Sequence, residues 1–100
     1  MWNYNFYIYI TTNPEKTVIY VGVTNDLRIR LHQHYENRGK KNSFAGKYYC
    51  YNLVYYEHFH HIEHAIDREK EIKKWRRAKK IALIESVNPE WRFLNNDISD

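Results

Sequence analysis

Five side chains of the sequence are of the types that hydrolysis of a phosphodiester requires. They comprise two phenols, a guanidinium, an imidazole and a carboxylate: Tyr9, Tyr20, Arg30, His34 and Glu69. Together these groups could supply a base, a proton acceptor, a clamp for phosphate charge and a ligand for a metal ion. Each also has an ordinary structural interpretation, so their placement in the fold decides which role they play.

Glu69 interrupts an apolar helical stripe. Helical spacing from residue 62 onward predicts a buried face that carries Glu69 among apolar side chains, namely Ile62, Ala65, Ile66, Ile72 and Trp75. A buried charge is costly unless it is paired, bound to a metal or neutralised. An internal salt bridge, for instance with Arg30, explains the position of Glu69 as well as a functional role does.

Arg30 and His34 lie four residues apart and therefore share one face of a predicted helix. That face borders the apolar stripe of Leu27, Leu31 and Tyr35 rather than the solvent side. Taken alone, Arg30 is best explained by an aliphatic stem that covers the core, and His34 by an ordinary boundary position. Their occurrence together with two tyrosines and Glu69 favours the functional interpretation.

A second group of histidines invites comparison with a zinc site. His58, His60, His61 and His64 lie close together in sequence, and the second and fourth are four residues apart. The group has no nearby cysteine pair and no HExxH pattern. We therefore interpret it as a polar surface cluster.

Two predicted strands carry the tyrosines. Phe6, Ile8 and Ile10 alternate with polar residues, and the alternation returns at Ile19, Val21 and Val23 after a turn over residues 13–16. A symmetric hairpin centred between residues 14 and 15 places Tyr9 opposite Tyr20, on the face away from both apolar series. Gly22, two residues beyond Tyr20, would let a substrate backbone approach the strand end.

The remaining chain predicts helices, a loop and one more strand. A helix begins after Asn25 or Asp26 and ends by Gly39, and the polar segment 37–47 is expected to be a mobile basic loop. The predicted third strand covers residues 48–59, a helix follows from His61, and a last short helix covers residues 79–87. The order β-β-α-β-α-α predicts an α/β fold of the α+β kind, a small three-stranded antiparallel sheet flanked by helices.

Length and composition predict a single domain over residues 1–100, with its core at about residues 5–94. The chain has 100 residues, 43% of them apolar, a net charge of +4 and a pI near 9.2. The single cysteine excludes an internal disulfide, and no signal sequence opens the chain. The longest apolar run has five residues, whereas a membrane-spanning helix needs roughly 20. We expect a soluble, cytoplasmic monomer that does not bind membranes.

The spacing of the five side chains resembles that of the GIY-YIG nucleases. Tyr7-Ile8-Tyr9 stands where that family has its first tripeptide, and Tyr20-Val21-Gly22 where it has the second. Arg30 follows Tyr20 by ten positions, His34 follows Arg30 by four, and Glu69 matches the family's metal-binding glutamate. Asn88, before Pro89, matches a downstream asparagine of many members. The resemblance covers about residues 5–94 and is greatest to short free-standing bacterial members.

The resemblance implies an endonuclease that depends on a divalent metal, Mg²⁺ or Mn²⁺, held by Glu69 together with water and the scissile phosphate. Arg30 would clamp that phosphate. Tyr9 would activate water and pass a proton to His34, while Tyr20 orients the water; either tyrosine fits the base. The expected products are 5′-phosphate and 3′-hydroxyl ends. A role in DNA repair or recombination is consistent with such an activity.

Nucleic acid, most simply DNA, is the expected partner because basic residues are concentrated in two segments. Eight of the thirteen residues from 68 to 80 are basic. The residues expected to contact phosphate are Arg38, Lys40, Lys41, Lys70, Lys73, Lys74, Arg76, Arg77, Lys79 and Lys80. No appended recognition module is evident, so binding should be biased by structure rather than sequence, with a protein partner as a source of specificity. The alternatives are a non-catalytic nucleic-acid-binding module and a protein-interaction domain.

Overall fold

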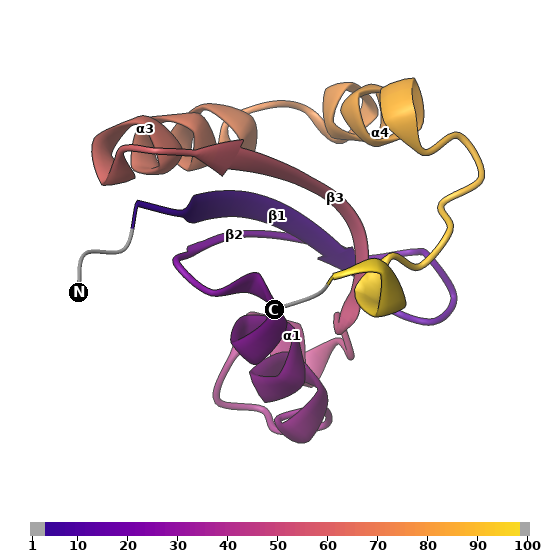
Figure 1. Ribbon diagram of the computed structural model, residues 1–100. Coiled ribbons are helices and arrows are strands. Elements are labelled where there is room, and N and C mark those ends of the chain that lie inside the picture. The colour runs from indigo at the N-terminus through magenta and orange to yellow at the C-terminus, as the bar shows by residue number, and fades with distance from the viewer. Residues whose placement is uncertain (1–3, 99–100) are drawn as a thin grey trace.

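The computed structural model describes residues 4–98, which form a three-stranded antiparallel sheet with helices on both faces (Figure 1). The elements are β1 (Phe6–Thr12), β2 (Ile19–Thr24), α1 (Leu27–Glu36), α2 (Phe44–Lys47), β3 (Asn52–Phe59), α3 (Ile62–Lys73), α4 (Arg77–Val87) and a short 3-10 helix, η1 (Asn95–Asp97). The predicted fold class and the order of the longer elements are confirmed. The short helix α2 was not predicted.

The sheet has the strand order β2-β1-β3, and both pairs are antiparallel. The predicted pairing of Tyr9 with Tyr20 is wrong by two residues, because Tyr9 pairs with Gly22 and Tyr20 pairs with Thr11. A shift of two keeps every side chain on its predicted face. Ile8, Ile10 and Val21 therefore still share one apolar core, as the alternation indicates.

Asn13 explains the shifted register, because its side chain holds a loop longer than the predicted turn. Its Oδ1 atom accepts hydrogen bonds from the backbone N–H groups of Thr17 (2.8 Å) and Val18 (2.9 Å). Lys16 lies in the left-handed region at φ 61°, and its N–H donates to the Asn13 carbonyl. Pairing therefore resumes only at Ile19, which faces Thr12.

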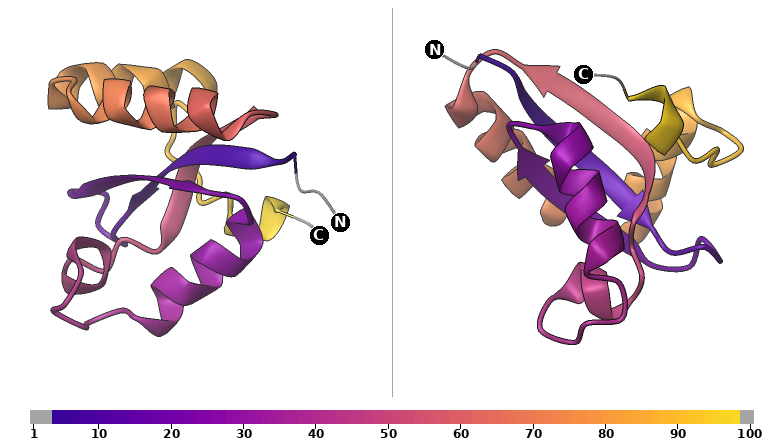
Figure 2. Two further views of the ribbon diagram at one scale, coloured as in Figure 1. Left: turned by 90° about the vertical axis from the view of Figure 1, so that its left-hand side faces the viewer. Right: turned by 60° about the horizontal axis from the view of Figure 1, so that its bottom comes forward.

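Two apolar clusters lie on opposite faces of the sheet. In Figures 1 and 2, α3 and α4 cover one face and α1 lies against the other. The α3 face holds the larger cluster, which includes Ile72 and Ile84 from the helices. The α1 face holds Leu27, Leu31 and Leu53 around the ring of Tyr9. Both faces of this small sheet are thus buried, which is why a central strand can bury a tyrosine on the side away from its isoleucines.

Helix α1 begins as predicted, because the Asp26 side chain accepts a hydrogen bond from the backbone N–H of Ile29 (3.0 Å). Its buried stripe differs from the prediction at one position. His34 is 6% exposed, whereas Tyr35 is 47% exposed. The stripe follows the i, i+4, i+7 spacing from Leu27, which selects His34 and turns Tyr35 outward.

The predicted mobile loop over residues 37–47 is instead a compact turn that contains α2. The Ser43 side chain accepts a hydrogen bond from the backbone N–H of Gly46 at 3.1 Å and so caps α2. A Cβ atom on Gly46 would lie 2.6 Å from the Lys40 carbonyl oxygen, so only glycine permits this close packing. Strand β3 consequently starts at Asn52, after Tyr49 has passed through the left-handed region at φ 59°.

Helices α3 and α4 match their predicted positions, although α4 begins two residues earlier, at Arg77. In α3, Ala65 and Ile72 are buried, whereas Ile62 is 39% exposed and does not belong to the buried stripe. After α4, the chain runs along the outer edge of β3, where the Leu94 N–H donates to the Leu53 carbonyl (2.7 Å). None of the helices within residues 4–98 is long and apolar enough to cross a membrane.

Candidate active site

Three of the predicted site residues form one buried hydrogen-bonded group beneath α1. The Tyr9 hydroxyl oxygen lies 2.8 Å from His34 Nε2 and 3.1 Å from Arg30 Nε. Tyr9 comes from the middle of β1, and the other two come from one face of α1, as their four-residue spacing predicts. Tyr9 is completely buried, and His34 is 6% exposed.

The chemistry of the donors fixes the direction of both hydrogen bonds. A guanidinium can only donate, so Arg30 Nε–H donates to the Tyr9 oxygen. The Tyr9 hydroxyl also has a side-chain hydrogen bond with Tyr20, and we assign its own proton to His34 Nε2, the imidazole nitrogen 2.8 Å away. With this assignment, a proton leaving Tyr9 would arrive at His34, and we call Tyr9, Arg30 and His34 the relay.

Burial sets the protonation states of the relay. Burial, followed by the charge of Arg30, lowers the pKa of His34 to about 4, so the imidazole is neutral at pH 7 and able to accept a proton. Burial, followed by interaction with Tyr20, raises the pKa of Tyr9 far above its ordinary value. Tyr9 is therefore a neutral phenol in this structure.

Tyr20 lies beside the relay and is more accessible than Tyr9. Its ring centroid is 5.3 Å from that of His34 and 6.2 Å from that of Tyr9. Tyr20 is partly exposed on the edge strand β2, where it packs against the apolar cluster of the α1 face. Burial alone would lower the pKa of Arg30, but interactions with Tyr9 and Tyr20 raise it. The pKa values of Tyr9 and Arg30 thus depend on each other and on Tyr20.

Gly22 has a role that differs from the predicted one. A Cβ atom at this position would lie 2.5 Å from the Tyr9 hydroxyl oxygen. The space opposite Tyr9 on β2 is therefore filled by the tyrosine's own ring, and not by a substrate backbone. Gly22 allows the buried phenol to lie across the neighbouring strand and reach α1.

Arg30 has no carboxylate partner within residues 4–98. Besides Tyr9, it donates from Nη1 to the Gln33 side-chain oxygen (3.1 Å), which is neutral. The salt bridge between Arg30 and Glu69 that the sequence left open is thus absent from this part of the chain, because Glu69 pairs with Lys73 instead (3.3 Å). The positive charge of Arg30 is left available for an anion.

Glu69 lies on α3, across the sheet from α1, with a side chain that is only 16% exposed. On a helix, residues 68 and 69 flank the buried line through Ala65 and Ile72 on opposite sides. Arg68 reaches toward β3, so Glu69 faces the other edge of the sheet, where β2 carries Tyr20. Helix geometry therefore directs Glu69 toward the β2 edge of the sheet, and within residues 4–98 its ion pair is with Lys73 and not with the relay.

A divalent ion held by Glu69 fits this chemistry. Mg²⁺ prefers oxygen ligands and is commonly held by one or two carboxylates together with waters and substrate phosphates. Glu69 supplies one such carboxylate, and the ion pair that it forms within residues 4–98 is with the half-exposed Lys73. Within residues 4–98, no group of three His, Cys, Asp or Glu side chains is arranged to hold a metal, and this includes the histidines near the start of α3. Those histidines form ring contacts in pairs, His58 with His60 and His61 with His64.

Asn88 lies away from the relay, at the end of α4. Its side-chain amide donates to the carbonyls of Val54 and Arg92 (both 2.9 Å), and its Oδ1 accepts from the Arg92 N–H. These bonds attach the turn after α4 to β3. The predicted role of Asn88 in catalysis stays a prediction, but its position here is explained by the turn that it holds.

The predicted phosphate-binding residues fall on two sides of the sheet. Arg38, Lys40 and Lys41 lie in the turn that follows α1. The others lie on or between α3 and α4, which cover the opposite face, namely Lys70, Lys73, Lys74, Arg76, Arg77, Lys79 and Lys80. Three of these are already engaged, because Lys73 pairs with Glu69, Arg77 Nη2 donates to the Thr17 carbonyl (2.7 Å) and Lys79 lies over the Trp75 ring. The residues near 38–41 are on the side of the relay.

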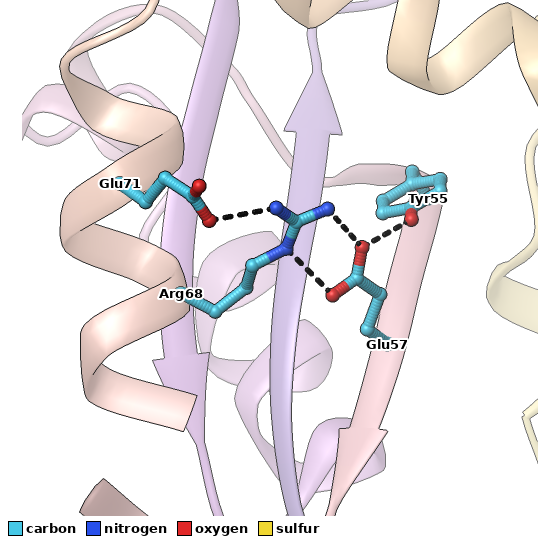
Figure 3. Close-up of polar contacts among 4 residues, drawn as sticks. All are labelled: Tyr55, Glu57, Arg68 and Glu71. Atoms are coloured by element: carbon cyan, nitrogen blue, oxygen red, sulfur yellow. Dashed lines mark hydrogen bonds and ion pairs between the residues drawn. The ribbon is translucent and has the colours of Figure 1, made fainter. Parts of the chain in front are cut away.

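A second arginine-centred network, which no sequence pattern predicted, joins α3 to β3 (Figure 3). Arg68 donates from Nε and Nη2 to both carboxylate oxygens of Glu57 (2.9 and 3.0 Å) and from Nη1 to Glu71 (2.7 Å). The Tyr55 hydroxyl also donates to Glu57. Arg68 and Glu57 are eleven residues apart and in different elements, so no local pattern indicates the pair.

Comparison with known proteins shows the family to which this chain belongs. The GIY-YIG catalytic domain matches residues 5–82. A UPF0213 protein of Bacillus pumilus (strain SAFR-032) is 33% identical over 90 residues, which are 90% of this chain and 89% of the relative. The solution NMR structure of a UPF0213 protein from Bacillus halodurans is similar with a TM-score of 0.56 at 27% identity, over 93% of each chain. The resemblance seen in the motif spacing is confirmed, and the chain belongs to the GIY-YIG family.

Proposed function

We propose that this protein is an endonuclease that hydrolyses nucleic-acid phosphodiester bonds, most simply those of DNA, with the help of one divalent metal ion. The observation that carries the proposal is the relay, in which a guanidinium that has no carboxylate partner among residues 4–98 is joined to a buried tyrosine and a neutral histidine. A phosphate group supplies the anion that Arg30 lacks. Membership of the GIY-YIG family supports nuclease chemistry at this position.

In this proposal, Tyr20 takes the proton of the attacking water. Tyr9 has no exposed surface, whereas Tyr20 is partly exposed beside it. As Tyr20 accepts the proton of water, it releases its own to the Tyr9 oxygen, and Tyr9 passes its proton to His34 Nε2. A bound phosphate offsets the charge of Arg30, one of the two causes that keep the pKa of His34 low. Substrate binding therefore makes His34 a better proton acceptor.

In this proposal, Arg30 binds the scissile phosphate and Glu69 binds the metal ion that neutralises it. Arg30 donates to a phosphate oxygen and stabilises the charge that develops there. Glu69 would hold Mg²⁺ or Mn²⁺ at the β2 edge, and a metal ion bound there would neutralise phosphate oxygens. Lys73, which is half-exposed, can release the carboxylate by swinging into solvent.

The basic turn after α1 supports a substrate path on the relay side. Its cations, Arg38, Lys40 and Lys41, contact phosphates without reading sequence, so binding falls steeply with salt. A nuclease of this kind, biased by DNA structure, would suit repair or recombination, with a partner protein that supplies specificity.

The test is a screen of duplex, branched, flapped and single-stranded DNA and of RNA, each with Mg²⁺ or Mn²⁺. We expect metal-dependent nicking of at least one substrate and loss of nicking in Glu69→Gln. Glu71→Gln is the matched control, because Glu71 is an exposed carboxylate on the same helix. Cleavage by Glu69→Gln at the wild-type rate contradicts the proposal. Salt-sensitive binding without cleavage of any substrate would identify a non-catalytic binding module instead.

A further inference from the structure

Exposed aromatic rings continue from the site onto the surface of α2. The Phe44 ring is stacked on that of Tyr20, with centroids 6.3 Å apart and planes at 25°. Tyr48 follows, with its ring centroid 4.8 Å from that of Phe44. Phe44 is 50% exposed and Tyr48 is 39% exposed. One end of this series is therefore Tyr20, and the other is open to solvent.

The aromatic rings are held in place by a tightly bonded turn. The Gly39 N–H donates to the Gly46 carbonyl (2.8 Å), and the Cys50 N–H donates to that of Ala45 (2.9 Å). A Cβ atom on Gly46 would lie 2.7 Å from the Asn37 carbonyl oxygen. The two exposed rings thus project from a fixed backbone, which lowers the entropic cost of ordering them around a ligand.

One cation lies beside these rings, and two more lie in the neighbouring turn. Lys47 Nζ lies 5.3 Å from the centroid of the Tyr48 ring. Lys40 and Lys41, also exposed, lie in the turn that packs against α2. Cations interleaved with exposed aromatic rings are the arrangement that binds single-stranded nucleic acid, in which charge follows the backbone and rings stack on bases.

We propose that Phe44 and Tyr48 form a stacking subsite for an unpaired base of the substrate strand, next to the phosphate that Arg30 binds. This inference rests on the proposed function and narrows its substrate to strands with unpaired bases. In a duplex, the faces of internal bases are covered by their neighbours and cannot reach a protein ring. A single strand, flap or loop exposes them. The expected ligand is therefore a nucleotide strand whose base lies on Phe44 while its phosphate lies toward Tyr20.

The experiment compares a short oligothymidylate with its fully abasic counterpart of the same length. Both carry the same phosphates, so the ratio of their Kd values isolates the contribution of the bases. We would measure both by fluorescence anisotropy at low salt with EDTA, which prevents cleavage. For the wild-type protein we expect about 5- to 150-fold tighter binding of the intact strand, the range of one stacked base.

Phe44→Leu should bring this ratio close to one, because leucine keeps the apolar bulk but lacks a ring. Phe44→Trp should preserve the ratio. The matched control is Phe93→Leu, since Phe93 is 38% exposed and has Lys16 Nζ 5.2 Å from its ring centroid, much like Tyr48 and Lys47. That variant should keep the wild-type ratio, and circular dichroism would show that all variants are folded.

A wild-type ratio near one, the same ratio in Phe44→Leu as in the wild type, or an equal loss in Phe93→Leu would overturn the inference. If neither the intact nor the abasic strand binds at low salt, the inference is also overturned, and a protein ligand for these rings is favoured. The outcome is separable from that of the cleavage screen. A protein that shows the base-dependent ratio but never cuts contradicts only the nuclease proposal, whereas one that cuts without such a ratio contradicts only the stacking subsite.

Discussion

Two arginines, one on each face of the sheet, are bonded in contrasting ways. Arg68 on α3 is paired with Glu57 through both carboxylate oxygens and with Glu71 through Nη1 (Figure 3). Arg30 on α1 donates to a tyrosine and to an amide, and has no carboxylate partner in the described residues. The Arg68 network is electrically compensated, whereas the Arg30 network is not.

This difference suits a structural role for the Arg68 network and the proposed active-site role for the Arg30 network. The hydrogen bonds that Arg68 donates to Glu57 raise the pKa of Arg68. Burial alone would raise the pKa of Glu57, but the hydrogen bonds that it accepts from Arg68 and Tyr55 lower it. Both groups of this network are held in their charged forms, which favours a permanent clamp between α3 and β3. In the other network, a neutral tyrosine and a neutral histidine lie beside an uncompensated cation. This arrangement supports the proposal that Arg30 binds an anion and that His34 accepts a proton.

The largest expected effect is on the cleavage rate, which should fall when Tyr20 beside the Arg30 network is replaced but not when Tyr55 of the Arg68 network is replaced. Tyr20→Phe removes the proposed base and should lower the single-turnover cleavage rate by about 100- to 10,000-fold, the usual contribution of a general base. Tyr55→Phe removes the hydroxyl that donates to Glu57 and should leave the rate per folded molecule unchanged. Equal losses in both variants would show that the two networks do not differ in this way.

The second prediction concerns the pH dependence that His34 contributes. Its pKa is about 4 in the folded protein, below its ordinary value of about 6.5 in an unfolded chain. Between these values the unfolded state binds more protons, so stability is complete above about pH 6.5 and falls as the pH drops toward 4. The loss is at most about 3 kcal/mol.

Urea unfolding at a series of pH values would measure this effect. His34→Gln should flatten the profile between pH 6.5 and 4, whereas His64→Gln, which alters an exposed histidine, should not. If His34→Gln keeps the full slope, the buried histidine is not neutral as described.

The third and smallest effect tests the compensated network. Arg68→Gln leaves Glu57 partly buried without its cation and should reduce the free energy of unfolding by about 1–3 kcal/mol, less than a fully buried pair would lose. The double variant Arg68→Gln, Glu57→Gln should recover part of this loss, because the uncompensated carboxylate is then gone. A double variant whose loss equals the sum of the single ones would show that the pair is not coupled.

Local patterns predicted most of the fold. Alternation in residues 6–10 and 19–23 placed each side chain on its correct face, and helical spacing placed Arg30 and His34 together. The register was wrong because a shift of two residues preserves the alternation, so only the Asn13 loop decides it. Helix α2 was missed because its four residues are too few to show a period, and its stability comes from the Ser43 cap and the contact at Gly46.

Contacts between distant segments were beyond the reach of these patterns. The pairing of Glu57 with Arg68 depends on how α3 lies over β3, and Arg68 was indistinguishable in sequence from its basic neighbours. The complete burial of Tyr9 likewise depends on a second apolar layer, contributed by Leu27, Leu31 and Leu53. The signal that was available for Phe44 is its position among tyrosines and lysines, but its stacking on Tyr20 requires the fold.

The most direct test of the contrast is cleavage by the two matched variants Arg30→Gln and Arg68→Gln, measured under single-turnover conditions on the substrate found by the screen. Rates would be corrected for the folded fraction at the assay temperature. We predict that Arg30→Gln lowers the rate by about 100- to 1,000-fold, as loss of a charge-stabilising donor does, while Arg68→Gln retains the wild-type rate. Wild-type cleavage by folded Arg30→Gln would contradict the assignment of the active site to the Arg30 network.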